Sequence, residues 1–154
     1  MDKREFSARA MGCAQRLWRI AYLILRNEAD CDDAVQEALL RAWTRIDSLR
    51  DAARFETWLV RILINTARSM LRRRRDHADV EDLPLAAPPV DTDLRDAIRA
   101  LDVPLRLPLI LHHVEGYTIE ECAALLRLPR TTVKWRLNVA RKKLREIMEV
   151  KDDA

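Results

Sequence analysis

Apolar side chains recur at three- and four-residue steps along most of this chain. On an α-helix such positions share one face, so each stretch with this spacing predicts an amphipathic helix. The expected helices cover residues 5–26, 30–46, 54–75, 92–101, 104–114, 118–126 and 130–147. Glycine, which tight turns between strands usually require, occurs only at Gly12 and Gly116. The pattern therefore predicts an all-α fold.

The helix expected over residues 54–75 has two contrasting faces. Its apolar face should be buried and contains Phe55, Trp58, Leu59, Ile62, Leu63, Thr66 (through its methyl group), Ala67 and Met70. Arg61, Asn65, Arg68 and Arg72 share a second face without an acid, which leads into four consecutive arginines at positions 72–75. Such arginines can neutralise phosphates, although the arginine run alone fits a solvated helix equally well. Asn65 favours nucleic acid, because an Asn can pair bidentately with a base edge.

The preceding helix is acidic. Five acids and no base occur from Glu28 to Glu37, and Asp30 is the expected N-cap. The side chains expected to face solvent are Asp32, Asp33, Gln36, Glu37 and Leu40. Capping and solubility explain the first acids but not a patch that continues to Glu37. An acidic patch beside a basic helix suggests two partners, one cationic and one anionic.

A change in composition divides the chain. Residues 76–92 contain three prolines and several acids and show no helical period, so they predict a flexible acidic linker. The expected organisation is a helical domain over 1–75, a linker over 76–92 and a second helical domain over 93–154.

The second domain ends in a helix-turn-helix pattern. Thr118 and Glu121 fit a capping box, and a three-residue turn at 127–129 leads into a helix with a regular core stripe. Residues 127–145 contain eight Lys or Arg and no acid. The second helix of such a pair enters the major groove, N-terminus first. The residues expected at DNA are Arg130, Thr131, Thr132, Lys134 and Trp135 at the bases, and Arg136 and Arg141–Arg145 along phosphates.

Composition excludes several classes of function. The three cysteines are far apart and odd in number, which indicates a reducing compartment rather than a disulfide framework or a zinc site. His112 and His113 are adjacent, so they point in different directions and predict no metal site. The sequence offers no catalytic triad and no phosphate-binding glycine loop, so we expect no enzyme and no cofactor. No membrane span or signal peptide is recognisable, and a cytoplasmic location is expected.

Four sequence blocks, in the order in which they occur along the chain, resemble those of the extracytoplasmic-function (ECF) type sigma factors of bacterial RNA polymerase. The blocks are DDAVQE (32–37) with LLRAW (39–43), FETWLVRI (55–62), EGYTIEECAAL (115–125) and LPRTTVKWRL (128–137). The resemblance covers nearly the whole chain and implies two helical domains, the second a helix-turn-helix domain. It also implies three partners, which are core RNA polymerase, promoter DNA and an anti-sigma factor.

The resemblance assigns roles to particular residues. The set implied to dock on polymerase is Asp33, Gln36, Glu37 and Trp43. The set implied to bind and melt the minus-ten element is Trp58, Arg61, Asn65, Arg68, Arg72 and Arg73, with Asn65 helping to capture a flipped base. The set implied to read the minus-thirty-five element is Arg130, Thr131, Thr132, Lys134, Trp135, Arg136 and Arg141. Val60 stands where an aromatic residue is common, so stacking on melted DNA is expected to be weaker or to be supplied by Trp58.

Two other readings remain open at this point. A sigma-like decoy that only sequesters an anti-sigma protein would keep the hydrophobic surfaces but would need no basic reading face. An ordinary helix-turn-helix repressor would leave the acidic helix and Asn65 unexplained.

Overall fold

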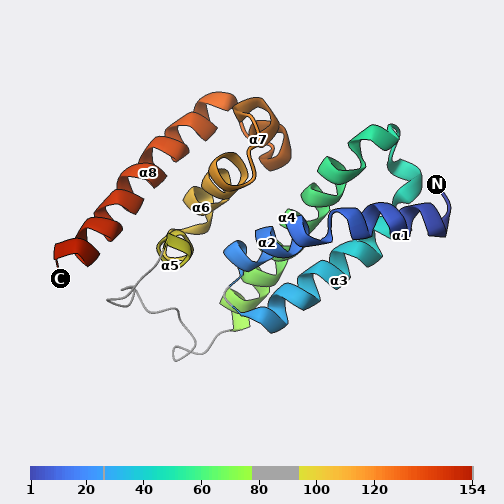
Figure 1. Cartoon of the computed structure of the whole chain (residues 1–154), viewed down its shortest axis with the longest axis horizontal. Coiled ribbons are helices and arrows are strands. Elements are labelled where there is room, and N and C mark those ends of the chain that lie inside the picture. The colour runs from blue at the N-terminus through green and yellow to red at the C-terminus, as the bar shows by residue number, and fades with distance from the viewer. Residues whose placement is uncertain (26, 78–93, 154) are drawn as a thin grey trace. The chain divides into compact units, whose positions relative to one another are not determined.

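The computed structural model describes residues 1–25, 27–77 and 94–153, and these residues form helices and short connections without a strand (Figure 1). The all-α prediction is thereby confirmed. The chain separates into two compact units, Met1–His77 and Ala78–Ala154. Most of the segment predicted as a linker lies outside the described residues.

The first unit is built around two long helices. Its elements are α1 (Lys3–Gly12), α2 (Ala14–Ile24), α3 (Glu28–Thr44), the 3-10 turns η1 (Ile46–Ser48) and η2 (Ala52–Arg54), and α4 (Phe55–His77). Helix α4 packs against both α2 and α3 (Figure 1). Leu17 and Ile20 of α2 and Leu63 of α4 are fully buried between these helices.

The prediction of one helix over residues 5–26 is wrong, because the chain breaks at Cys13. The Cys13 N–H donates to the Ala10 carbonyl at 3.2 Å, and Cys13 has φ −115° and ψ 10°. The preceding Gly12 costs a helix roughly 1 kcal/mol relative to Ala. The break lets α1 turn so that the Phe6 ring meets the ring of Phe55, with centroids 5.6 Å apart.

Helix α3 begins earlier than predicted, with Asn27 and not Asp30 as its N-cap. The Asn27 side-chain oxygen accepts from the Asp30 N–H at 2.8 Å, and its amide donates to the Asp30 carboxylate at 2.9 Å. Asp30 therefore lies in the first turn of the helix, where it is 8% exposed. Asn and Asp are equally good caps, so sequence preference alone could not choose between them.

The buried face of α4 is wider than its apolar spacing predicts. Phe55, Leu59, Leu63 and Ala67 are buried as expected, and Val60 and Ile64 are also fully buried. Thr66 is fully buried too, and its hydroxyl donates to the Ile62 carbonyl at 2.8 Å. This breadth follows from the position of α4, which packs against α2 and α3 along its length and also contacts α1.

The second unit contains α5 (Leu94–Arg99), α6 (Val103–Leu109), the π-helical turn η4 (Ile110–Val114), α7 (Ile119–Leu126) and α8 (Arg130–Asp153). Pro108 lies inside α6, and the Glu115 N–H then donates to the Ile110 carbonyl at 3.0 Å, a π-type bond. The wider turn shifts the helix register. This shift explains why the apolar Val114 is 40% exposed while Leu111 is fully buried.

The helix-turn-helix pair forms as predicted. Thr118 and Glu121 make both hydrogen bonds of the capping box at the start of α7. Arg127 ends that helix in the left-handed conformation, with φ 55° and ψ 49°. In α8, Val133, Leu137 and Ala140 are fully buried, so the opposite face of α8 is turned outward.

Candidate nucleic-acid interface

The outward face of α4 carries five of the six residues implied to act at the minus-ten element. Trp58, Arg61, Asn65, Arg68 and Arg72 follow one another at three- and four-residue steps, which on a helix extend over roughly 21 Å. Asn65 is exposed at the centre of the row, and its side chain makes no hydrogen bond to another described residue. The row therefore places one exposed, neutral amide among cationic side chains.

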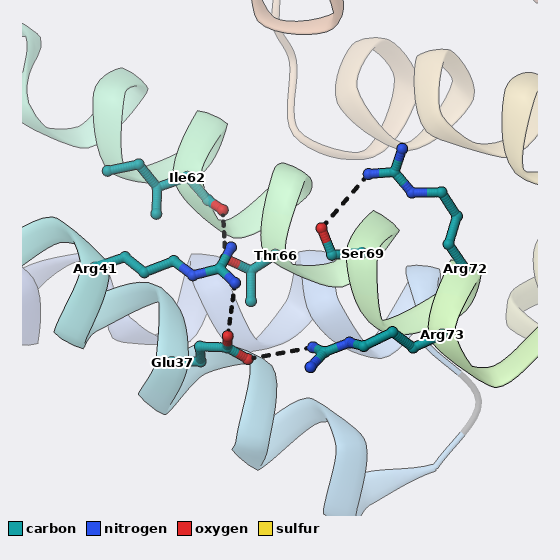
Figure 2. Close-up of polar contacts among 7 residues, drawn as sticks. All are labelled: Glu37, Arg41, Ile62, Thr66, Ser69, Arg72 and Arg73. Carbon is teal, nitrogen blue, oxygen red and sulfur yellow. Dashed lines mark hydrogen bonds and ion pairs between the residues drawn. The ribbon is translucent and has the colours of Figure 1, made fainter. Parts of the chain in front are cut away.

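Arg73, the sixth residue, does not continue this row. Its guanidinium lies 3.7 Å from the Glu37 carboxylate on α3 (Figure 2). The neighbouring Arg74 forms an ion pair with Asp30 of the same helix α3. Arg72 instead lies on the other side of α4, with one nitrogen 3.5 Å from the Ser69 hydroxyl (Figure 2). The arginine run is thus divided between the outward face and α3.

Glu37 is the centre of a polar chain that links α3 to α4. Its Oε1 accepts from Arg41 at 2.7 Å, and Arg41 also donates to the Thr66 hydroxyl at 3.3 Å (Figure 2). Through the bond from Thr66 to the Ile62 carbonyl, this chain reaches the buried backbone of α4 (Figure 2). Glu37 therefore lies between two cationic neighbours, Arg41 and Arg73.

The outward face of α3 borders two open surface hollows. A hollow of about 630 Å³ is lined by Asp33, Gln36, Glu37, Leu40, Met70, Arg73 and Arg74. A more apolar hollow of about 380 Å³ is lined by Lys3, Phe6, Ser7, Gln36, Leu39, Leu40 and Trp43. The four residues implied to dock on polymerase are thus brought together along one face of α3, with Leu40 between the two hollows.

Two tryptophans of the predicted sets, the exposed Trp43 and the partly buried Trp58, contact phenylalanine rings. Trp43 is 38% exposed and meets Phe6 edge-on, with ring centroids 5.2 Å apart. Trp58 contacts Phe55, with centroids 5.9 Å apart. Because Val60 is fully buried, the ring of Trp58 is the aromatic group that the described α4 offers on its outward side.

The start of α8 presents the second predicted set. Thr131, Lys134 and Trp135 are exposed, Trp135 at 64%, whereas Thr132 and Arg136 are partly buried. Arg130 forms an ion pair with Glu120 of α7 at 2.7 Å. Further along α8, Arg141 of the same set donates to Asn138 at 2.7 Å and lies 3.2 Å from His113. Arg130 and Arg141 thus each have polar partners, whereas Trp135 between them is exposed.

Burial shifts the pKa of two thiols and one imidazole among the described residues. Burial raises the pKa of the Cys122 thiol to about 11, with a further contribution from Glu121. Burial also raises the pKa of the Cys13 thiol, and it lowers the pKa of His113, which also faces His112 and Arg141. The described residues contain no group of three or more potential metal ligands.

The sequence analysis missed the ion pairs that involve α3, both within that helix and with α4. The pair of Glu37 with Arg41 has the i,i+4 spacing that a helix brings together, so a signal for it was present. The pairs of α3 with Arg73 and Arg74 depend on how α3 lies along α4, which spacing does not give. The burial of Arg106 at 2% exposure, with bonds to the carbonyls of Arg99 and Leu101, likewise had no local signal.

Two protein-family models match this chain, and each covers most of one of its two units. The model of sigma-70 region 2 matches residues 11–83, and that of sigma-70 region 4 matches residues 91–144. The ECF RNA polymerase sigma factor SigM of Mycobacterium tuberculosis is 34% identical over 141 residues, which cover 87% of this chain and 72% of SigM. EcfG of Rhodopseudomonas palustris is 37% identical over 139 residues, which cover 82% of this chain and 76% of EcfG.

A solved structure agrees with these relatives. The sigma factor RpoE of Bartonella quintana, in complex with the anti-sigma factor NepR, has a TM-score of 0.80 and 25% identity. The match covers 96% of this chain and 98% of RpoE.

These matches define a sigma-70 type protein with regions 2 and 4. The chain belongs to the ECF RNA polymerase sigma factors, as its sequence blocks predicted, and its function is to direct transcription initiation at promoters. That family is not a class of enzymes. Among the described helices, none is long and apolar enough to cross a membrane.

Proposed function

We propose that this chain recognises promoters with two separate helical surfaces while a third surface holds it on core RNA polymerase. Residues 1–75 dock on polymerase and open the minus-ten element, and residues 93–154 read the minus-thirty-five element. Residues 76–92 are the linker between these two domains. The observation that carries the proposal is the exposed Asn65 in the middle of a cationic helical row whose reverse side is fully buried.

Opening of the minus-ten element is assigned to the outward face of α4. The arginines of this row neutralise phosphates, and Asn65 pairs with the edge of a base that has left the stack. The partly exposed Trp58 supplies a surface on which a base stacks. This sigma factor thereby opens DNA by binding unpaired bases, and it makes or breaks no covalent bond itself.

Polymerase docking is assigned to the outward face of α3, through Asp33, Gln36, Glu37 and Trp43. Acidic groups beside an apolar hollow suit a partner helix that presents basic and apolar side chains together. The charge of this face is opposite to that of the α4 row, so the two partners approach different sides of the first unit.

The minus-thirty-five element is assigned to the N-terminal turns of α8. Arg130, Thr131, Lys134 and Trp135 are positioned to reach base edges, while Arg136 and Arg141 lie along phosphates. Control by an anti-sigma factor is proposed from the similar sigma factor RpoE, whose structure contains one. The chain acts in the cytoplasm, where polymerase and promoters are found.

The test is to separate promoter opening from duplex binding. Asn65→Ala should reduce opening, measured by permanganate reactivity of unpaired thymines, by about tenfold or more while duplex affinity stays within twofold. Arg72→Ala is the matched control on the same face. This variant should weaken binding to all DNA sequences. It should also reduce the dependence of DNA affinity on salt concentration by the equivalent of about one phosphate contact. Equal loss of opening and duplex binding in Asn65→Ala contradicts the proposed role.

A further inference from the structure

Glu37 joins two surfaces that the proposed function assigns to different partners. It lies on the polymerase-docking face of α3, and its second carboxylate oxygen faces Arg73 at the basic end of α4 (Figure 2). We propose that Glu37 restrains Arg73 in the free chain, and that a cationic side chain of the docked polymerase displaces Arg73 and frees it for a phosphate. This inference rests on the proposed docking role of α3.

The two cationic neighbours of Glu37 differ in their distance from its carboxylate and in their other contacts. Arg41 is 2.7 Å from the carboxylate and is also bonded to the fully buried Thr66. Arg73 is 3.7 Å away, beyond hydrogen-bond length, and its side chain is 61% exposed. An exposed pair at this distance is weak and easily screened. Arg73 is therefore the neighbour that an incoming cation displaces, while Arg41 keeps Glu37 in place.

The neighbouring ion pair between Arg74 and Asp30 connects the end of α4 to α3 independently of Arg73. Arg74 is paired with Asp30, whose side chain is only 12% exposed and also accepts from Asn27. This pair keeps the end of α4 against α3 when Arg73 leaves. Displacement of Arg73 therefore moves one side chain and does not require the helices to separate.

The hollow beside Glu37 gives the displacing group access. Its lining includes the acids Asp33 and Glu37 and the apolar side chains of Leu40 and Met70, with Arg73 at the same site. Asp33 forms no ion pair with another described residue. A lysine or arginine entering on a partner helix thus meets two acids and competes directly with Arg73.

The consequence is a link between docking and DNA affinity. While it is held near Glu37, Arg73 contributes less to a phosphate site, and after release it adds about one phosphate contact. The expected gain in affinity is a few-fold at low salt, and it should shrink as salt rises. Polymerase binding and nucleic-acid binding then favour each other, as linkage between two sites requires.

The experiment measures binding of the full, polymerase-free chain to a fluorescent single-stranded oligothymidylate at low salt. Glu37→Gln, which keeps the shape of the side chain, should bind about two- to fivefold more tightly than the wild type. Asp32→Asn is the matched control, because it removes one exposed acid of the same helix without releasing an arginine, and should change affinity by less than about 1.5-fold. Thermal unfolding of each variant verifies that it is folded.

The Arg73→Ala background isolates the proposed mechanism. Glu37→Gln combined with Arg73→Ala should bind no more tightly than Arg73→Ala alone. A gain in DNA affinity that persists without Arg73, or one equal to that of Asp32→Asn, overturns the restraint, because long-range charge then explains the gain.

Polymerase affinity of Glu37→Gln separates this inference from the proposed function. Weaker polymerase binding together with tighter DNA binding supports the link. If Glu37→Gln binds polymerase more weakly but DNA no more tightly, the restraint of Arg73 by Glu37 is overturned, whereas the docking role of Glu37 still stands. If it binds DNA more tightly but polymerase equally well, the link between docking and DNA affinity is overturned, and Glu37 does not belong to the docking surface.

Discussion

The basic ends of α4 and α8 have similar charge but different neighbours. At the end of α4, Arg73 and Arg74 face Glu37 and Asp30 of an acidic helix, and Asp30 is largely buried. At the start of α8, the ion pair of Arg130 with Glu120 is exposed on both sides, with 57% and 59% side-chain exposure. The basic end of α4 in the first unit is thus partly paired with a neighbouring acidic helix, whereas the start of α8 carries only an exposed pair. Under the proposed function, this difference fits a DNA-opening surface that is restrained until polymerase binds and a DNA-reading surface that is always accessible.

The largest expected effects concern the two cores, which should be independent. Leu63→Ala in the first unit and Leu137→Ala in the second each remove a fully buried side chain and should lower the free energy of unfolding by about 2–5 kcal/mol. Because the chain divides into two units, each variant should destabilise only its own unit. Hydrogen exchange measured residue by residue checks this. Equal loss of protection in both units would show that they unfold together.

DNA binding by α8, the proposed recognition helix, should depend on Trp135. Trp135→Ala should weaken binding to the minus-thirty-five duplex by about 1–3 kcal/mol, the range for loss of one good base contact. If the ring contacts a thymine methyl group, replacing that thymine by uracil should weaken wild-type binding roughly fourfold, since one buried carbon is worth about 0.8 kcal/mol. Gel-shift titrations with single thymine-to-uracil duplexes measure both effects. The same uracil penalty in Trp135→Ala would place the contact elsewhere.

The two kinds of ion pair should differ in their effect on stability. Asp30→Asn should cost about 1 kcal/mol, because the carboxylate is largely buried, although its partner Arg74 is half exposed. Glu120→Gln should cost less than about 0.5 kcal/mol, the usual value of an exposed pair. Urea unfolding followed by circular dichroism gives both values. A larger loss for Glu120→Gln would reverse the proposed contrast between the units.

The smallest expected effect is the reaction of the buried thiols. Burial raises the pKa of Cys122 to about 11, so its thiolate is scarce at pH 8, and its reactivity should rise only as the pH approaches 11. Cys13 is also buried and its pKa is raised, but it lies at the break between α1 and α2. Iodoacetamide labelling with peptide mass analysis should therefore modify Cys13 before Cys122. The opposite order would indicate that the second unit opens more readily.

The sequence predicted what depends on spacing along one helix. The apolar stripe of α8, the capping box at Thr118 and the exposed row around Asn65 all follow from positions three or four residues apart. The break at Cys13 and the cap at Asn27 were missed, because several residues there have similar local preferences. The link between Glu37 and Arg73 was missed because it depends on how α3 packs along α4, a distance of 36 residues in sequence. The functional sets remain predictions, since fold and family do not test single side chains.

Core-dependent transcription tests the central claim most directly. The purified chain is mixed with sigma-free bacterial RNA polymerase and fragmented DNA from its own genome, and the transcript start sites are sequenced. We expect discrete start sites that share two upstream elements, and we expect Asn65→Ala to abolish most of them while polymerase binding is retained. Failure of the chain to bind polymerase, or starts without shared upstream elements, would contradict the account.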